Sequence, residues 1–258
     1  MLSATGCTAN EAFFFDMPEG VTNLTDRIRH LWEGAWIAAW AVGVLTWALI
    51  IYAIIVYRRR RGAPTPVQTR YNLPIEIMYT VAPLIMILGL FFFSTRDQLA
   101  IQELSPEPDN TVNVVAFRWS WGFNYLDEQV YDVGTPGQRP TLWLPVDESV
   151  RFELTSPDVN HSFWVPQFLY KMDVIPGRVN RFEVTPTKEG TYAGKCAELC
   201  GVDHSRMLFD VRVVSRAQYA AHMAELRAKG QTGVFGSDRE LENADNVEKT
   251  QNQNGGRG

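Results

Sequence analysis

The chain has 258 residues, of which 46% are apolar, and it contains three cysteines and four histidines. This length and composition exclude a chain that is disordered throughout, and they allow one sizeable domain together with a further apolar element. The formal net charge of −5 gives no basis for attracting a polyanion, so we expect no nucleic-acid partner.

Residues 1–31 are predicted to form an external N-terminal segment. Its start, LSATGC, leads through small residues to Cys7 and is similar to a bacterial lipoprotein processing site. Six residues before the cysteine are too few for a signal peptide with an apolar core. Either the true start lies upstream or the similarity is accidental, so a lipid-carrying Cys7 and a free thiol remain open alternatives.

Two runs without any charged side chain follow, over residues 34–57 and 77–95. As helices they would span roughly 36 Å and roughly 28 Å, close to the hydrocarbon thickness of a bilayer. A pair of buried core helices is the alternative, but both runs are apolar all round and longer than usual core helices. We therefore predict a transmembrane hairpin over residues 32–100.

Four consecutive arginines, residues 58–61, directly follow the first run. Basic residues concentrate in cytoplasmic loops, so the loop between the two spans is expected in the cytoplasm. Both termini and everything after Arg96 then lie on the outer side of the membrane, which we take to be the plasma membrane of a bacterium.

From residue 101 the pattern changes to short strands rich in Val, Phe, Trp and Thr, separated by Gly, Pro and Asp. The candidate strands are TVNVVAFRWSWGFNY, TLWLPVDESVRFELTS, RVNRFEVTP and LFDVRVV. We predict an extracytoplasmic β-sandwich or barrel over residues 101–214. Residues 215–230 are predicted to form a helix capped by Ser215, and residues 231–258 a disordered tail.

The β region is acidic, with 17 Asp and Glu against 10 Lys and Arg over residues 97–214, a net charge of −7. An acidic outer face favours a cationic partner through electrostatic steering. A requirement for solubility alone would produce the same charge, and charge counts do not separate the two.

The stretch CAELCGVDHSRM, residues 196–207, holds two of the three cysteines of the chain, one of its four histidines and a methionine. Its two cysteines could form a disulfide, or Cys and His could hold structural zinc. From Cys200 onward, however, Cys-x-x-x-His-x-x-Met has the ligand spacing of a blue-copper loop, and methionine favours copper over zinc. His161, upstream in SPDVNHSFWVP at the end of a predicted strand, is the candidate second imidazole.

Cys196 adds a thiolate that one copper ion does not need. Two thiolates, two imidazoles, a thioether and a backbone carbonyl suit two copper ions bridged by both sulfurs. The full pattern, C-x-E-x-C-x-x-x-H-x-x-M with an upstream histidine, resembles subunit II of haem–copper cytochrome c oxidases. The resemblance covers residues 32–214, including RWSWGFNY and KMDVIPGR, and it implies a cupredoxin-like domain that carries the dinuclear copper centre, CuA.

The resemblance implies a role for each ligand. Cys196 and Cys200 would bridge both copper ions, His161 and Met207 would complete one ion, and His204 and the Glu198 carbonyl the other. The Glu198 carboxylate would bind Mg²⁺ at the contact with subunit I. A hard oxygen ligand suits Mg²⁺.

Three further positions match functional positions of the family. Trp119 is expected to be the exposed residue at which electrons arrive, whereas Trp121, assigned the opposite strand parity, is expected to serve packing. Asp158 would help to dock a cationic cytochrome. Glu76, at the cytoplasmic end of the second span, would lie at the mouth of a proton-uptake path.

The resemblance implies transfer of electrons from cytochrome c, or from a membrane-bound c-type cytochrome, to haem in subunit I, where O₂ is reduced to water and protons are pumped. Subunits I and III and the lipid bilayer are the expected partners. The chain has no C-x-x-C-H haem motif, so haem is expected only in subunit I. The alternatives are a quinol-oxidase-type subunit II and a membrane-anchored copper-binding or copper-delivery protein.

Overall fold

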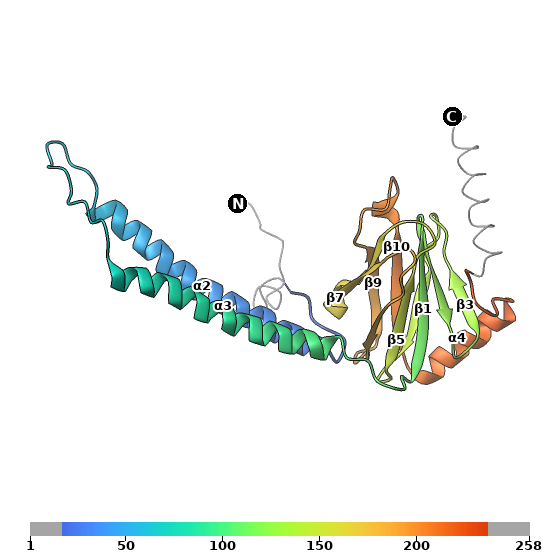
Figure 1. The fold of residues 1–258 in the computed structure, drawn as a ribbon. Helices are drawn as coiled ribbons and strands as arrows, with labels where there is room; N and C mark the ends of the chain where they lie inside the picture. Colours follow the sequence, from blue (N-terminus) through green and yellow to red (C-terminus); the bar gives the residue numbers. More distant parts are fainter. Residues whose placement is uncertain (1–16, 237–258) are drawn as a thin grey trace, which may run out of the picture. The chain divides into compact units, whose positions relative to one another are not determined.

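The computed structural model describes residues 17–236, so Cys7 lies outside the described residues. The chain divides into two units, one of residues 27–101 and one formed by the residues before and after them. Figure 1 shows the helices of the first unit and the strands of the second.

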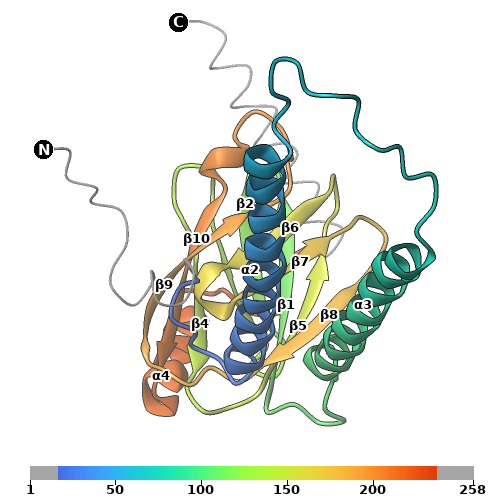
Figure 2. The ribbon, with the colours of Figure 1, turned by 90° about the vertical axis from the view of Figure 1, so that its left-hand side faces the viewer.

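Two long helices make up the first unit. Helix α2 spans Thr25–Val56 and helix α3 spans Leu73–Ile101. A loop joins the two helices, which run in opposite directions (Figures 1 and 2). Each contains an apolar window long enough to cross a membrane, and no residue of either window is buried within the structure. Core helices would bury such windows, so the alternative of two buried core helices does not hold.

An ion pair joins the start of α2 to the end of α3. Arg27 Nη1 lies 3.0 Å from Asp97 Oδ1, and Arg96 Nη2 lies 2.9 Å from the same oxygen. Asp97 is 3% exposed, and a buried carboxylate needs such partners. The ion pair between Arg27 and Asp97 therefore links the two helices just outside their charge-free runs.

The second unit is a sandwich of two five-stranded sheets, which confirms the predicted fold class. Neighbouring strands are antiparallel except β1 with β5 and β4 with β10. The first sheet has the order β3 (Val130–Val133), β2 (Ser120–Tyr125), β1 (Asn110–Phe117), β5 (Val150–Thr155), β8 (Asn180–Val184). The second has the order β4 (Thr141–Pro145), β10 (Leu208–Val214), β9 (Gly190–Cys196), β6 (His161–Val165), β7 (Tyr170–Val174).

Aromatic rings from both sheets meet in the core. Trp121 of β2 lies with its ring centroid 5.8 Å from that of Phe163 on β6 and 5.1 Å from that of Phe209 on β10. All three side chains are at most 1% exposed. Such ring contacts add to the burial of apolar area, and they hold the two sheets together next to the ends of β6 and β9.

The strand boundaries differ from the sequence prediction. Residues 111–125, predicted as a single strand, form the hairpin of β1 and β2, with Phe117 paired to Ser120 across a turn at Arg118 and Trp119. The run contains no Gly, Pro or Asn at this turn, so the usual turn signals were missing. Strands β3, β6, β7 and β9 are shorter or less regular in pattern, and the sequence did not single them out.

Helix α4 spans Arg216–Ala228, and the predicted cap is confirmed because the Ser215 side chain accepts a hydrogen bond from the Gln218 N–H. The segment after it contradicts part of the predicted disordered tail. The Asn124 amide donates to the Phe235 carbonyl at 2.9 Å and accepts from the Phe235 N–H at 2.7 Å. Residues 231–236 therefore pack on the first sheet, and residues 237–258 lie outside the described residues.

The segment before α2 also packs against the sandwich. The Val21 N–H donates to the Gln167 carbonyl at 3.1 Å, and the Val21 carbonyl accepts from the Thr187 N–H at 2.9 Å. The Val21 side chain is 3% exposed. The few apolar residues of this stretch show no regular period, so the sequence indicated only an external segment here.

Val21→Ala is expected to destabilise the sandwich by roughly 1–3 kcal/mol, because it removes buried apolar atoms and leaves a cavity while it keeps the backbone hydrogen bonds. The measurement is the denaturant midpoint of the full chain in detergent, followed by near-ultraviolet circular dichroism. Val179, which is 44% exposed, provides the control Val179→Ala. Equal midpoints for the two variants would contradict the docking of this segment.

Candidate metal centre

His161 occupies the first position of β6, not the end of a strand as the sequence had indicated, and its side chain is fully buried. Strand β6 pairs with β9 so that Phe163 lies opposite Cys196. Residues two apart on a strand share a face, so the imidazole lies on the same side of the sheet as the Cys196 sulfur.

The other ligands lie on the loop that joins β9 to β10. Cys196 is the last residue of β9 and Met207 directly precedes β10. The Cys196 N–H donates to the Met207 carbonyl at 3.1 Å, which closes the loop at its base. Within the loop, the 3-10 helix η2 (His204–Arg206) turns the chain back toward the strands.

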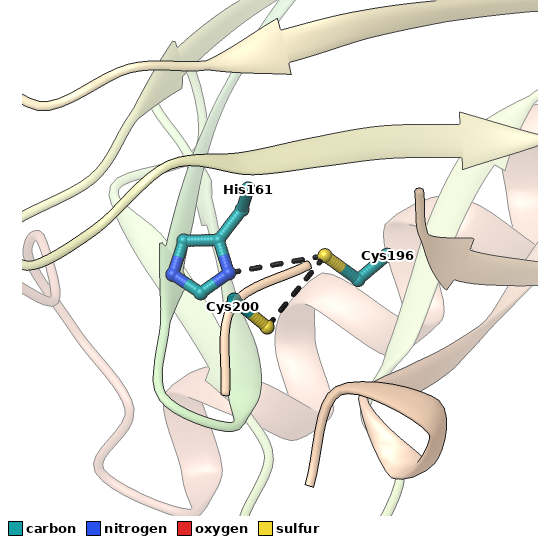
Figure 3. Close-up of side chains that lie close together, drawn as sticks. All are labelled: His161, Cys196 and Cys200. Atoms are coloured by element: carbon teal, nitrogen blue, oxygen red, sulfur yellow. Dashed lines mark hydrogen bonds between the residues drawn. The ribbon is translucent and has the colours of Figure 1, made fainter. Parts of the chain in front are cut away.

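Figure 3 shows the sulfurs of Cys196 and Cys200 close to each other, with the His161 ring beside them. Cys196 Sγ is 3.8 Å from His161 Nδ1 and 3.9 Å from Cys200 Sγ. Cys200 Sγ is 3.5 Å from His204 Nδ1 and 3.7 Å from Met207 Sδ. The Glu198 carbonyl lies 3.2 Å from Cys196 Sγ. The structure thus brings together all six predicted copper ligands.

These donors fit copper better than the alternatives. A disulfide requires sulfurs about 2.05 Å apart, and these are 3.9 Å apart. Since a metal–thiolate bond is about 2.3 Å long, an ion can contact both sulfurs at once. It can do so from either side of the line that joins the two sulfurs. Structural zinc uses four ligands and seldom a thioether, whereas this cluster offers six donors, including Met207.

Asp158 holds the His161 ring. Its Oδ1 lies 2.9 Å from His161 Nε2, so an Nε2–H donates to the carboxylate and Nδ1 faces Cys196. Its Oδ2 accepts from the Arg118 backbone N–H at 2.8 Å. The docking role expected of Asp158 stays a prediction, and its carboxylate, which is 17% exposed, already has these partners. Its contacts are those of a residue that orients a ligand.

Burial and hydrogen bonding shift the pKa values of the ionisable groups in this cluster in opposite directions. Burial raises the pKa of Asp158, but hydrogen bonds from His161 and from backbone N–H groups outweigh it and lower that pKa to about 2. Burial also raises the pKa of Cys196, yet its hydrogen bond with His161 brings it down to about 7. Burial, together with the neighbouring Cys196 sulfur, raises the pKa of Cys200. Cys196 is therefore the more readily ionised thiol.

Both tryptophans of the β1–β2 hairpin contact the ligand loop. Trp119 is half-buried in the turn, where its Nε1–H donates to the Cys200 carbonyl at 3.2 Å. Trp121 is fully buried on β2, and its Nε1 lies 3.4 Å from the Met207 carbonyl. Trp121 packs as expected, but strand parity was the wrong reason, because residues two apart share a face. The turn at Trp119 is what separates the two rings.

Two predicted carboxylates remain, those of Glu198 and Glu76. The Glu198 side chain is exposed, so its role toward Mg²⁺ stays a prediction. Glu76 Oε1 accepts from the Asn72 N–H at 3.0 Å, and Asn72 Oδ1 accepts from the Ile75 N–H at 3.5 Å. In the described structure Glu76 thus closes the first turn of α3, which is a capping role.

The fold and the cluster define a class: a cupredoxin-like β-sandwich with a candidate copper site, joined to two apolar helices. Residues 138–214 match the family model for the periplasmic domain of cytochrome c oxidase subunit II. The chain is 51% identical to the probable cytochrome c oxidase subunit 2 of Streptomyces avermitilis, over 90% of this chain and 85% of that protein. It is 31% identical to the cytochrome c oxidase subunit 2 of Mycobacterium tuberculosis H37Rv, over 90% and 80% of the two chains.

A solved structure of the periplasmic domain of subunit II of cytochrome oxidase from Bradyrhizobium japonicum is 30% identical, covers 49% of this chain and 99% of that chain, and has a TM-score of 0.45. On the sequence relationships, the chain belongs to the cytochrome c oxidase subunit II family.

Asp158→Ala is expected to lower copper affinity by about 10–100-fold, because it removes the acceptor that fixes the His161 ring. The measurement is competition with a chelator of known affinity, on the full chain in detergent. Asp210→Ala, on β10 outside the ligand set, is the matched control. Unchanged affinity in Asp158→Ala, with an altered salt dependence of the reaction with a c-type cytochrome, would support the docking role instead.

Proposed function

We propose that this chain accepts electrons from a c-type cytochrome at a dinuclear copper centre and passes them to haem in subunit I. The complex would reduce O₂ to water and pump protons. The cluster of two buried sulfurs flanked by two imidazoles, a thioether and a carbonyl carries the proposal. Membership of the subunit II family supports it.

When bound, the copper pair supplies a one-electron acceptor whose charge is shared between two bridged ions. The residues of this chain would supply the ligands and keep water away from them. Cys196 and Cys200 would be shared by both ions, with His161 and Met207 on one, and His204 and the Glu198 carbonyl on the other. Burial of the two thiols, at 5% and 4% exposure, keeps bulk water from the sulfurs.

Trp119 is the proposed point at which electrons arrive. Its half-buried ring reaches the surface of the domain, and its hydrogen bond to the Cys200 carbonyl links it directly to a ligand residue. The net charge of −7 over residues 97–214 would attract a cationic cytochrome, whether soluble or membrane-bound.

The remaining assignments follow from the family and complete the proposal. The exposed Glu198 carboxylate would bind Mg²⁺ at the contact with subunit I, and Glu76 would border a proton-uptake path. The two apolar helices would cross a bacterial plasma membrane beside subunits I and III, with residues 58–61 in the cytoplasm and the β domain outside.

Two other functions fit less well. A quinol-oxidase-type subunit II has no use for a complete set of copper ligands. A copper-delivery protein needs a site from which the ion leaves readily, whereas both thiols and His161 are buried here. The buried ligands favour a resident metal.

Cys200→Ser is expected to abolish the dinuclear signal, because it removes one of the two shared sulfurs. The intact copper-loaded chain should be purple and give the seven-line electron paramagnetic resonance pattern of one electron shared by two copper nuclei, and the variant at most a four-line pattern. Met223→Leu, a buried methionine of α4, is the control. A colourless, zinc-loaded wild-type chain would reject the dinuclear site.

Trp119→Phe is expected to slow reduction of the copper centre by a c-type cytochrome at least about tenfold. The smaller ring shifts the proposed entry point, and the rate of the reaction depends on ångström-scale positioning of the reacting groups. Stopped-flow spectroscopy of the assembled oxidase measures that rate. Trp143→Phe, on β4, is the control. If Trp119→Phe leaves the rate at the wild-type value, electrons reach the centre by another route.

A further inference from the structure

Gly201 follows the ligand Cys200 in the chain, and its Cα lies against the ring of Trp119. Its φ is +127°, in the region that favours glycine because other residues are strained there. Its carbonyl also accepts from the His204 N–H at 3.2 Å. The two peptide units on either side of the Gly201 Cα therefore contact Trp119, through the Cys200 carbonyl, and His204, through the Gly201 carbonyl.

The space beside Gly201 is filled by the indole. A methyl group placed on Gly201 would lie 3.0 Å from Trp119 Cζ2, 3.1 Å from Nε1 and 3.3 Å from Cε2. Ordinary carbon contacts are about 3.5–4.0 Å, so any side chain here would push the ring away. The Nε1–H···O bond to Cys200 is already 3.2 Å long, and a shift of a few tenths of an ångström would weaken it.

We propose that Gly201 is a positioning residue for electron transfer: its bare backbone lets the Trp119 ring rest against the ligand loop and bond to the Cys200 carbonyl. The proposal rests on the function proposed above for Trp119. It adds that the contact between ring and loop depends on the absence of a side chain at residue 201.

The test is Gly201→Ala in the assembled oxidase. Reduction of the copper centre by a c-type cytochrome is expected to slow roughly tenfold, a smaller loss than the ~100-fold that a 1 Å displacement can cause in catalysis. The paramagnetic resonance pattern of the copper and its reduction by a small diffusible one-electron reductant should stay as in the wild type. An altered copper spectrum with equal loss for both reductants would overturn the proposal, because it would mean a distorted centre.

Backbone strain needs its own control. Gly230, after α4, also has a positive φ, +77°, and a methyl group placed on it meets nothing within 4 Å. Gly230→Ala therefore introduces strain without a collision, and it should leave both rates unchanged.

The double variant Trp119→Ala/Gly201→Ala isolates the collision, because alanine lacks the whole ring that the methyl group on residue 201 would meet. Adding Gly201→Ala to Trp119→Ala is expected to change the cytochrome rate less than twofold. A further tenfold loss would overturn the proposal. Should Gly201→Ala alone fail to assemble, copper binding regained in the double variant supports the collision, and continued failure assigns the defect to strain.

Failure of this inference differs from failure of the proposed function. If Trp119→Phe itself does not slow the cytochrome reaction, the proposed function of Trp119 fails. If Trp119→Phe slows it and Gly201→Ala does not, only the role of Gly201 fails.

Discussion

The hydrogen bond from the Cys196 N–H to the Met207 carbonyl closes the loop on which the candidate metal centre depends. Strands β9 and β10 are antiparallel, so this bond is the last rung of a ladder that the core already stabilises. The ten residues beyond that rung must form a closed loop. A short loop with fixed ends costs less entropy to order than a long free one, so its ligands are held near one another without the metal. Preorganisation of this kind is what a site needs if copper is to remain in place.

The loop alone makes only part of the site, and the other elements reach it from both sheets. Strand β6, in the same sheet as β9, supplies His161. The β1–β2 turn of the opposite sheet supplies Trp119 and the Arg118 N–H that helps to hold Asp158. The ring contacts of Trp121 with Phe163 and Phe209 bind the two sheets immediately beside the cluster. Packing in the sandwich core thus fixes the distance between the ligand loop and the residue proposed to receive electrons.

The sequence predicted the candidate site well where its residues are close together in the chain. Cys196, Cys200, His204 and Met207 lie within one loop, so their spacing predicted their convergence. The two apolar helices were equally clear, because a long charge-free run is rare outside membrane-spanning helices.

Contacts between segments that are distant in the chain could not be predicted from the sequence. Nothing in the spacing of Asp158 and His161 shows that one carboxylate oxygen faces the ring while the other faces Arg118. Val21 and Phe235 were missed for a related reason, since each lies in a short stretch without a regular apolar period and its partner is more than 100 residues away.

The misplacement of Trp119 on a strand shows how a local error alters a functional interpretation. A ring on a regular strand would share its face with Trp121 and would be buried or exposed with the whole strand face. In the turn, Trp119 is free of that alternation: one edge donates to the Cys200 carbonyl while part of the ring remains accessible. A residue that must contact both a buried ligand loop and an external partner needs such a place. The same requirement explains why the neighbouring loop position is a glycine, since a side chain there would occupy the space that the ring uses.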